Sequence, residues 1–126
     1  MRLKILLLTA SVVTFIFGIG FLLAPVWFEA PYGVALDAGG ALLARFMGSA
    51  YVALGLMFWM GRNTQHAETR GILVTGGFAA SLLGLLVSIY DRVKGIENGL
   101  AWSTLVILLV LTIWFGYFYF VKPGVD

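Results

Sequence analysis

Cysteine is absent from the 126 residues, and histidine occurs once, as His66. A chain without cysteine has no disulfide, no thiolate nucleophile and no thiol redox centre of its own. A single histidine is too few for a usual protein metal site, which needs three or four clustered ligands. We therefore expect no metal centre and no catalytic residues, and the sequence argues against an enzyme.

Charge is also scarce, at 11% of residues against 61% hydrophobic, and the net charge is only +2. A soluble domain of this length needs more polar surface, and so small a net charge does not favour nucleic-acid binding. Most charges lie between four apolar stretches, each near the roughly 20 residues that cross a bilayer. The sequence predicts an all-α integral membrane four-helix bundle, one domain over residues 1–126, in a bacterial or archaeal inner or plasma membrane.

The predicted helices cover about residues 3–24, 41–60, 71–90 and 100–121. Pro25 ends the first helix because proline lacks a backbone donor. Asp37 is a plausible N-cap that would start the second helix earlier. The first apolar run, of about 20 residues, is longer than the roughly 7–15 of a signal peptide, so we expect a retained helix.

Basic residues predict the orientation, because Lys and Arg gather on the cytoplasmic side. The two termini and the second connection carry Arg2, Lys4, Arg62, Arg70 and Lys122. The other side carries Arg45, Arg92 and Lys94. The excess on the first side predicts that both termini are cytoplasmic.

Small residues predict where the helices pack, because in lipid close backbone approach drives helix association. Such residues recur on the second and third predicted helices: Gly48, Gly55, Gly76, Gly77, Ala80 and Gly84. We expect these two helices to form the tight centre, although the ridge on the third helix also suits an oligomer interface. The fourth helix is bulkier and is expected to face lipid or a partner.

Arg45 is the charge placed inside a predicted span, about 6 Å below its outer end at roughly 1.5 Å per residue. Charged groups within a span are costly and are usually paired or functional. Asp91 is the expected ion-pair partner, with hydroxyls from Tyr51 and Tyr90 nearby. The alternatives are an arginine that only anchors the helix and an outer-side pocket that binds a lipid or quinone head group. No cofactor is required by the sequence, although a quinone or lipid is compatible with it.

The order of these features resembles that of small four-helix membrane proteins of the DoxX-like type. The resemblance lies in the glycine-containing run from Gly18 to Pro25, in Arg45-Phe46-Met47-Gly48 and in Gly55, followed by a charged turn and a small-residue helix. It implies a small accessory subunit, sometimes tied to quinone-linked redox complexes. The thiol chemistry of some relatives does not carry over to a chain without cysteine.

Three functions follow as hypotheses. The first is a non-catalytic accessory subunit or assembly factor of a larger membrane complex. The second is a protein that binds a lipid-soluble ligand near Arg45. The third is an oligomeric transporter or channel, which is disfavoured because no carboxylate is predicted within a span. The expected partners are membrane lipid, a larger complex or a second copy of the chain, and not nucleic acid.

Overall fold

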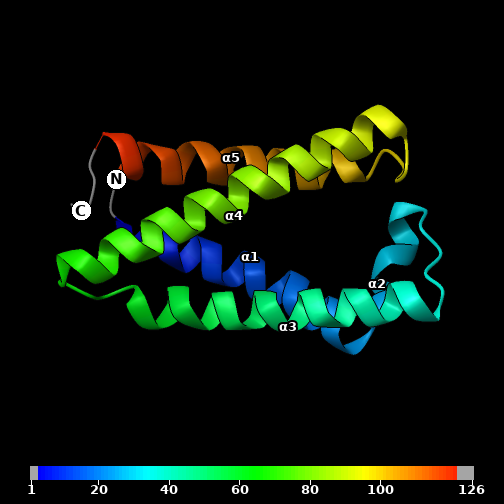
Figure 1. The fold of residues 1–126 in the computed structure, drawn as a ribbon, viewed down its shortest axis with the longest axis horizontal. Helices are drawn as coiled ribbons and strands as arrows, with labels where there is room; N and C mark the ends of the chain where they lie inside the picture. Colours follow the sequence, from blue (N-terminus) through cyan, green and yellow to red (C-terminus); the bar gives the residue numbers. More distant parts are fainter. Residues whose placement is uncertain (1–2, 122–126) are drawn as a thin grey trace.

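The structure, a computed structural model, describes residues 3–121, and that range is helical with short connections (Figure 1). The elements are α1 (Leu3–Leu23), α2 (Pro25–Glu29), the 3-10 helix η1 (Ala30–Tyr32), α3 (Ala38–Gly61), α4 (Ala67–Lys94) and α5 (Ala101–Phe120). Within the described range, α1, α3, α4 and α5 are each long and apolar enough to cross a membrane. The predicted all-helical class with four candidate spans is confirmed.

The four long helices associate as two pairs. α1 packs along α3, and α4 packs along α5, whereas α3 and α4 have few direct contacts (Figure 1). The expectation that the second and third long helices form the tight centre is therefore wrong. As expected, α5 is the least buried of the four long helices, with 22% of its span buried against 28–33% for the others, although its Phe115 and Phe118 belong to the core with Phe58 of α3.

The α1–α3 pair is joined where two glycines let the backbones touch. A Cβ atom on Gly48 would lie 2.6 Å from the Leu22 nitrogen and 2.7 Å from the Gly18 oxygen. A Cβ atom on Gly18 would in turn lie 2.8 Å from the Val52 nitrogen. Further along, Gly55 packs against Phe15 of α1. Gly48 and Gly55 are thus helix-packing residues, as predicted. The helix against which they pack, however, is α1 rather than α4.

The α4–α5 pair uses other glycines. A Cβ atom on Gly77 would overlap the Phe115 ring, and one on Gly84 would lie 3.2 Å from the Leu108 side chain. Gly76, the neighbour of Gly77, has nothing within 4 Å of an added Cβ atom, so it packs closely against no other helix among residues 3–121. Only part of the predicted small-residue ridge therefore serves helix packing.

α4 is longer than predicted at both ends. At its start, the Nδ1 atom of His66 accepts a hydrogen bond from the Thr69 backbone at 3.3 Å. At its end, Gly95 adopts a left-handed φ of 67° and donates its N–H to the Asp91 carbonyl at 2.7 Å. These caps, rather than the limits of the apolar run, determine where α4 begins and ends. The polar residues in its first and last turns are therefore also helical. Asp91 consequently lies within α4 and not in a loop.

α3 also starts earlier than residue 41. The Oδ1 atom of Asp37 accepts a hydrogen bond from the Gly40 nitrogen at 2.7 Å, which satisfies one of the free N–H groups at the helix start. The N-cap suggested by the sequence is confirmed.

Candidate binding cavity

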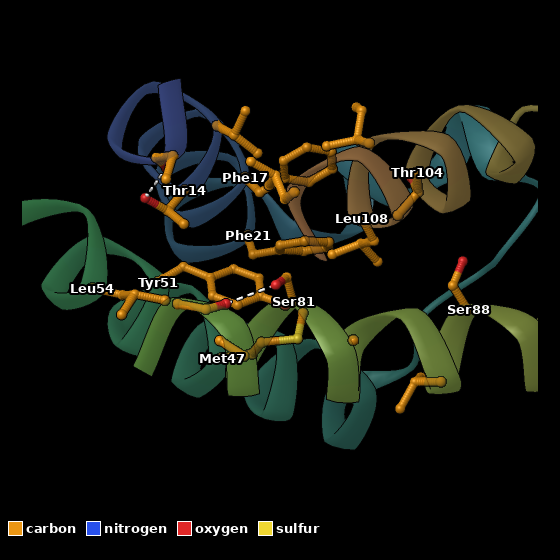
Figure 2. Close-up of a pocket in the computed structure, with 18 of the residues that line it drawn as sticks. Thr14, Phe17, Phe21, Met47, Tyr51, Leu54, Ser81, Ser88, Thr104 and Leu108 are labelled. Atoms are coloured by element: carbon orange, nitrogen blue, oxygen red, sulfur yellow. Dashed lines mark hydrogen bonds between the residues drawn. The ribbon is translucent and has the colours of Figure 1, made fainter. Parts of the chain in front are cut away.

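A cavity of about 370 Å³ lies between the α1–α3 pair and the α4–α5 pair (Figure 2). Its volume is within the range of sites for small organic molecules. Phe17, Phe21, Tyr51 and Leu108 point into it from three different helices. The rest of the wall is mainly apolar: Ala10, Val13, Met47, Leu54, Phe58, Ile107, Leu111 and Phe115.

Small residues on one face of α4 leave this space open. Gly77, Ala80, Ser81, Gly84 and Ser88 all line the cavity. Counted from Gly77, the other four lie three, four, seven and eleven residues further along, so all five share one face of the helix. The Ser81 hydroxyl donates to the Gly77 carbonyl at 2.7 Å, which reduces its polarity toward the cavity. Part of the ridge that was expected to bring helices together therefore holds a cavity open.

The cavity opens to the surface between α3 and α4. Met47 of α3 and Val87 of α4 both line it, yet they are 39% and 68% exposed. Ala80 is likewise a lining residue and exposed. Because α3 and α4 are both candidate spans, this opening lies on a side of the bundle that would face hydrocarbon in a membrane.

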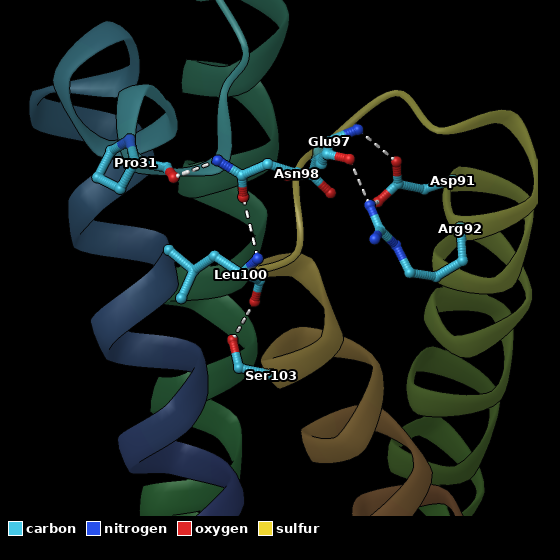
Figure 3. A network of polar contacts seen from close by, with 7 residues as sticks. All are labelled: Pro31, Asp91, Arg92, Glu97, Asn98, Leu100 and Ser103. Carbon is cyan, nitrogen blue, oxygen red and sulfur yellow. Dashed lines mark hydrogen bonds and ion pairs between the residues drawn. The ribbon is translucent and has the colours of Figure 1, made fainter.

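One end of the cavity is acidic. Glu29 of α2, Asp91 of α4 and Glu97 of the α4–α5 connection all line it. The Oδ1 atom of Asp91 accepts the Glu97 backbone N–H at 2.8 Å (Figure 3). Its Oδ2 atom lies 3.6 Å from the Arg92 guanidinium and, although buried, has no hydrogen-bond partner.

Burial and crowding change the acidity of two of these carboxyl groups. Burial raises the pKa of Glu97 to about 8, and the neighbouring Asp91 and Glu29 carboxyl groups add to this effect. Burial also raises the pKa of Glu29, an effect that its hydrogen bond with Glu97 opposes. Glu97 therefore keeps its proton at neutral pH and can donate it in a hydrogen bond to a neighbouring carboxylate.

Asn98 holds the acidic end together. Its Nδ2 atom donates to the Pro31 carbonyl at 2.9 Å (Figure 3). Its backbone N–H donates to the Tyr32 carbonyl at 2.8 Å. Its Oδ1 atom accepts the Leu100 N–H at 3.0 Å, at the start of α5. Asn98 thus connects the segment after α1 with the segment before α5, and so joins the two helix pairs at this end.

The four predicted site residues separate into two groups. Asp91 and the half-buried Tyr51 line the cavity. Arg45 is exposed and lines a different, shallower hollow with Leu22, Leu42, Phe46 and Ser49. Tyr90 is 58% exposed and lies beneath the Lys94 ammonium group.

The expected ion pair between Arg45 and Asp91 is not formed, and Asp91 pairs with Arg92 instead. The reason is the helical period of α3. Met47, Tyr51 and Leu54 face the cavity. At about 100° per residue, Arg45 is about 200° around the helix from Met47 and so projects from the opposite side.

Sequence reasoning did not select Glu29 and Glu97 as site residues. Both are in predicted connections, where an acidic residue usually faces water. The available signal was that Glu29, Asp37, Asp91 and Glu97 are all placed at one membrane level. That signal indicates an acidic side of the protein, but it does not indicate which of the carboxyl groups meet.

No protein-family model, curated protein or solved structure matches this chain. Among residues 3–121, no group of three acidic, histidine or cysteine side chains is arranged to hold a metal ion. The cavity and its acidic end are therefore the features from which a function can be inferred.

Proposed function

We propose that this small membrane protein binds a lipid-soluble molecule with a polar head in the cavity between its two helix pairs. The observation that carries the proposal is an apolar cavity of about 370 Å³ that has carboxyl groups at one end. An apolar wall favours the body of such a molecule by the hydrophobic effect, and the few polar groups orient its head.

The lateral opening supports the same proposal. A ligand dissolved in the bilayer would reach the cavity between α3 and α4, past Met47 and Val87, without crossing water. The ligand class is the one considered from the sequence, a lipid or a quinone-like molecule. The proposed site, however, is the central cavity rather than the surface around Arg45.

The other predicted roles stay predictions. An accessory subunit of a larger complex is compatible with a bound ligand, and the resemblance to DoxX-like proteins points in the same direction. The transporter hypothesis is compatible with Asp91, a buried carboxylate near the end of the long helix α4. Neither role has an observation as specific as the cavity.

The test compares two substitutions on neighbouring residues of α4. Ala80→Phe fills the cavity that Ala80 lines, whereas Ala79→Phe adds the same bulk at an exposed position that does not line it. Each protein is extracted gently from native membranes, and native mass spectrometry measures bound small molecules and bound proteins together. Wild type and Ala79→Phe are expected to carry a lipid-soluble molecule that Ala80→Phe lacks.

Equal ligand content in all three proteins, or none in wild type, would contradict the proposal. Stoichiometric recovery of a larger partner with both variants, and no ligand, would instead favour the accessory-subunit hypothesis.

A further inference from the structure

The charges at the acidic end of the cavity do not balance. Three carboxyl groups, those of Glu29, Asp91 and Glu97, line the cavity, and Arg92 is the cation beside them. No Lys or Arg is among the described residues that line the cavity itself. With every group ionised, this end would hold more negative than positive charge in a largely apolar setting, which is unfavourable.

Asp91 supplies a second, independent observation. The residue is only 8% exposed and lines the cavity, and its buried Oδ2 atom accepts no hydrogen bond from an N–H group, so the protonated Glu97 side chain is the donor left to this carboxylate. The Arg92 guanidinium is 3.6 Å from Oδ2, beyond hydrogen-bonding distance, and it donates instead to the Glu97 carbonyl. When Glu97 gives up its proton, the buried Asp91 carboxylate loses that donor, which is costly, and a donor group on a ligand would replace it.

We propose that the ligand of this cavity is an amphiphilic cation, an apolar body carrying a protonated amine, whose ammonium group binds between Glu29, Asp91 and Glu97. This inference depends on the proposed function and specifies the chemistry of the ligand. An ammonium group has only donors to offer, and carboxylates accept them through several lone pairs. The charge-assisted hydrogen bonds that result are stronger than neutral ones.

Other head groups fit this end less well. An anionic head would be repelled by the carboxylates. A quinone offers only acceptors, so it would compete with the Asp91 carboxylate for the Glu97 proton and would supply no donor in its place. A divalent metal ion is disfavoured because the carboxyl groups in the described part of the chain are not arranged as metal ligands.

Binding of the cation is coupled to release of a proton. The O–H bond of Glu97 breaks, its proton goes to bulk water, and an ammonium N–H donates to the carboxylate that results, so the charge of the site is conserved. The titratable groups that line the cavity with Glu97 are Glu29 from α2, Tyr32 from η1, Tyr51 from α3 and Asp91 from α4, and Arg92 of α4 lies beside Asp91. The lining residues of α1 and α5 carry no titratable side chain.

The experiment uses two probes of one shape, 4-phenylbutylamine and 4-phenylbutan-1-ol, with the full chain in a neutral detergent. Calorimetry in two buffers of different ionisation enthalpy gives both affinity and protons released. The amine is expected to bind about tenfold or more tightly than the alcohol, because hydrogen bonds to charged groups are the stronger ones. Near pH 7 it should release close to one proton per bound molecule, a release that disappears well above pH 8.

Glu97→Gln should abolish the proton release and weaken amine binding far more than alcohol binding. Glu68→Gln, at an exposed site in the first turn of α4, is the matched control and should behave as wild type. The wild-type proton count alone decides the matter if Glu97→Gln does not fold.

Equal affinity for amine and alcohol without proton release would overturn the cation proposal. If Ala80→Phe still blocked both probes in that case, the cavity would remain a ligand site and the proposed function would stand. Binding of neither probe, with no ligand recovered from native membranes, would overturn both.

Discussion

Gly48 lies where the backbones of α1 and α3 are in close contact, so the α1–α3 pair has no room for a side chain at this position. An added Cβ atom would lie 2.6 Å from the Leu22 nitrogen and 2.7 Å from the Gly18 oxygen, and backbone atoms cannot turn aside as a side chain does. We expect Gly48→Ala to force the two helices apart and to lower the free energy of unfolding by about 1–3 kcal/mol, the usual cost of overpacking. Unfolding by sodium dodecyl sulfate in mixed micelles measures this loss.

Gly76→Ala is the control, because an added Cβ atom there has nothing within 4 Å. It should leave stability unchanged or raise it by up to about 1 kcal/mol, since alanine is the better helix former. A loss as large as that of Gly48→Ala would show that destabilisation follows from any lost glycine and not from the Gly18–Gly48 contact.

Glu97 should make the stability of the protein depend on pH. Its pKa is raised from 4.5 to about 8 in the folded chain. Between these values the folded protein holds a proton that the unfolded chain releases, so the free energy of unfolding falls as pH rises. Stability should be highest near pH 4.5, decrease through pH 8 and level off above it. Melting temperatures in detergent across this range measure the effect.

Glu97→Gln mimics the protonated side chain and should flatten much of that dependence; Glu29, whose pKa is also raised, retains a part. Glu68→Gln should keep the wild-type curve, because Glu68 is exposed in the first turn of α4 and far along the helix from the acidic end. A curve for Glu97→Gln with the wild-type slope would contradict the assignment.

At the scale of the elements, the sequence predicts the existence of the helices better than their pairing. Length and hydrophobicity identify α1, α3, α4 and α5, and Asp37 correctly indicates the start of α3. The pairing of the helices is harder to predict, because a glycine that contacts another helix and a glycine beside open space cannot be distinguished in the sequence. Gly76 and Gly77 are neighbours, yet only Gly77 packs against a helix. What separates them is the rotation of α4 relative to α5, which no single-helix pattern contains.

Asn98 is expected to hold η1 and the α4–α5 connection together. Asn98→Ala removes the side-chain hydrogen bonds to the Pro31 carbonyl and from the Leu100 N–H, at a cost of about 1–2 kcal/mol of local stability. Faster amide hydrogen exchange should then appear in two segments distant in sequence, residues 30–33 and 95–100. Mass spectrometry of exchanged peptides resolves both.

Ser103→Ala is the matched control, because the Ser103 hydroxyl donates only to the Leu100 carbonyl one turn earlier. It should leave exchange around Pro31 unchanged. Faster exchange in the 95–100 segment alone after Asn98→Ala would show that this residue stabilises its own loop without joining the helix pairs.

At the scale of the whole molecule, the candidate site could be predicted only in part. Asp91 and Tyr51 were selected from the sequence and do line the cavity, whereas Arg45 was selected for its charge and lies outside. The cavity itself exists because the helix pairs meet across small residues of α4. Glu29 and Glu97 reach its acidic end only because the short helices after α1 and the connection after α4 fold over that end. Such convergence of distant segments depends on tertiary structure.

The acidic end of the cavity faces one side of the membrane. A polar head group bound there, and any proton released there, would be in contact with water on that side. Both connections at that end, before α3 and after α4, lie opposite the end where α1 begins and α5 finishes (Figure 1). The excess of Lys and Arg at the latter end predicts that it is cytoplasmic, and the acidic end is then expected to be external. Because the chain has no cysteine, Ile96→Cys and Asn63→Cys, both at exposed connection positions, provide single labelling sites at the two ends. In intact cells a membrane-impermeant maleimide should label Ile96→Cys, and it should label Asn63→Cys only after permeabilisation. The reverse pattern would place the acidic end in the cytoplasm, and a cationic ligand would then exchange its proton with the cell interior.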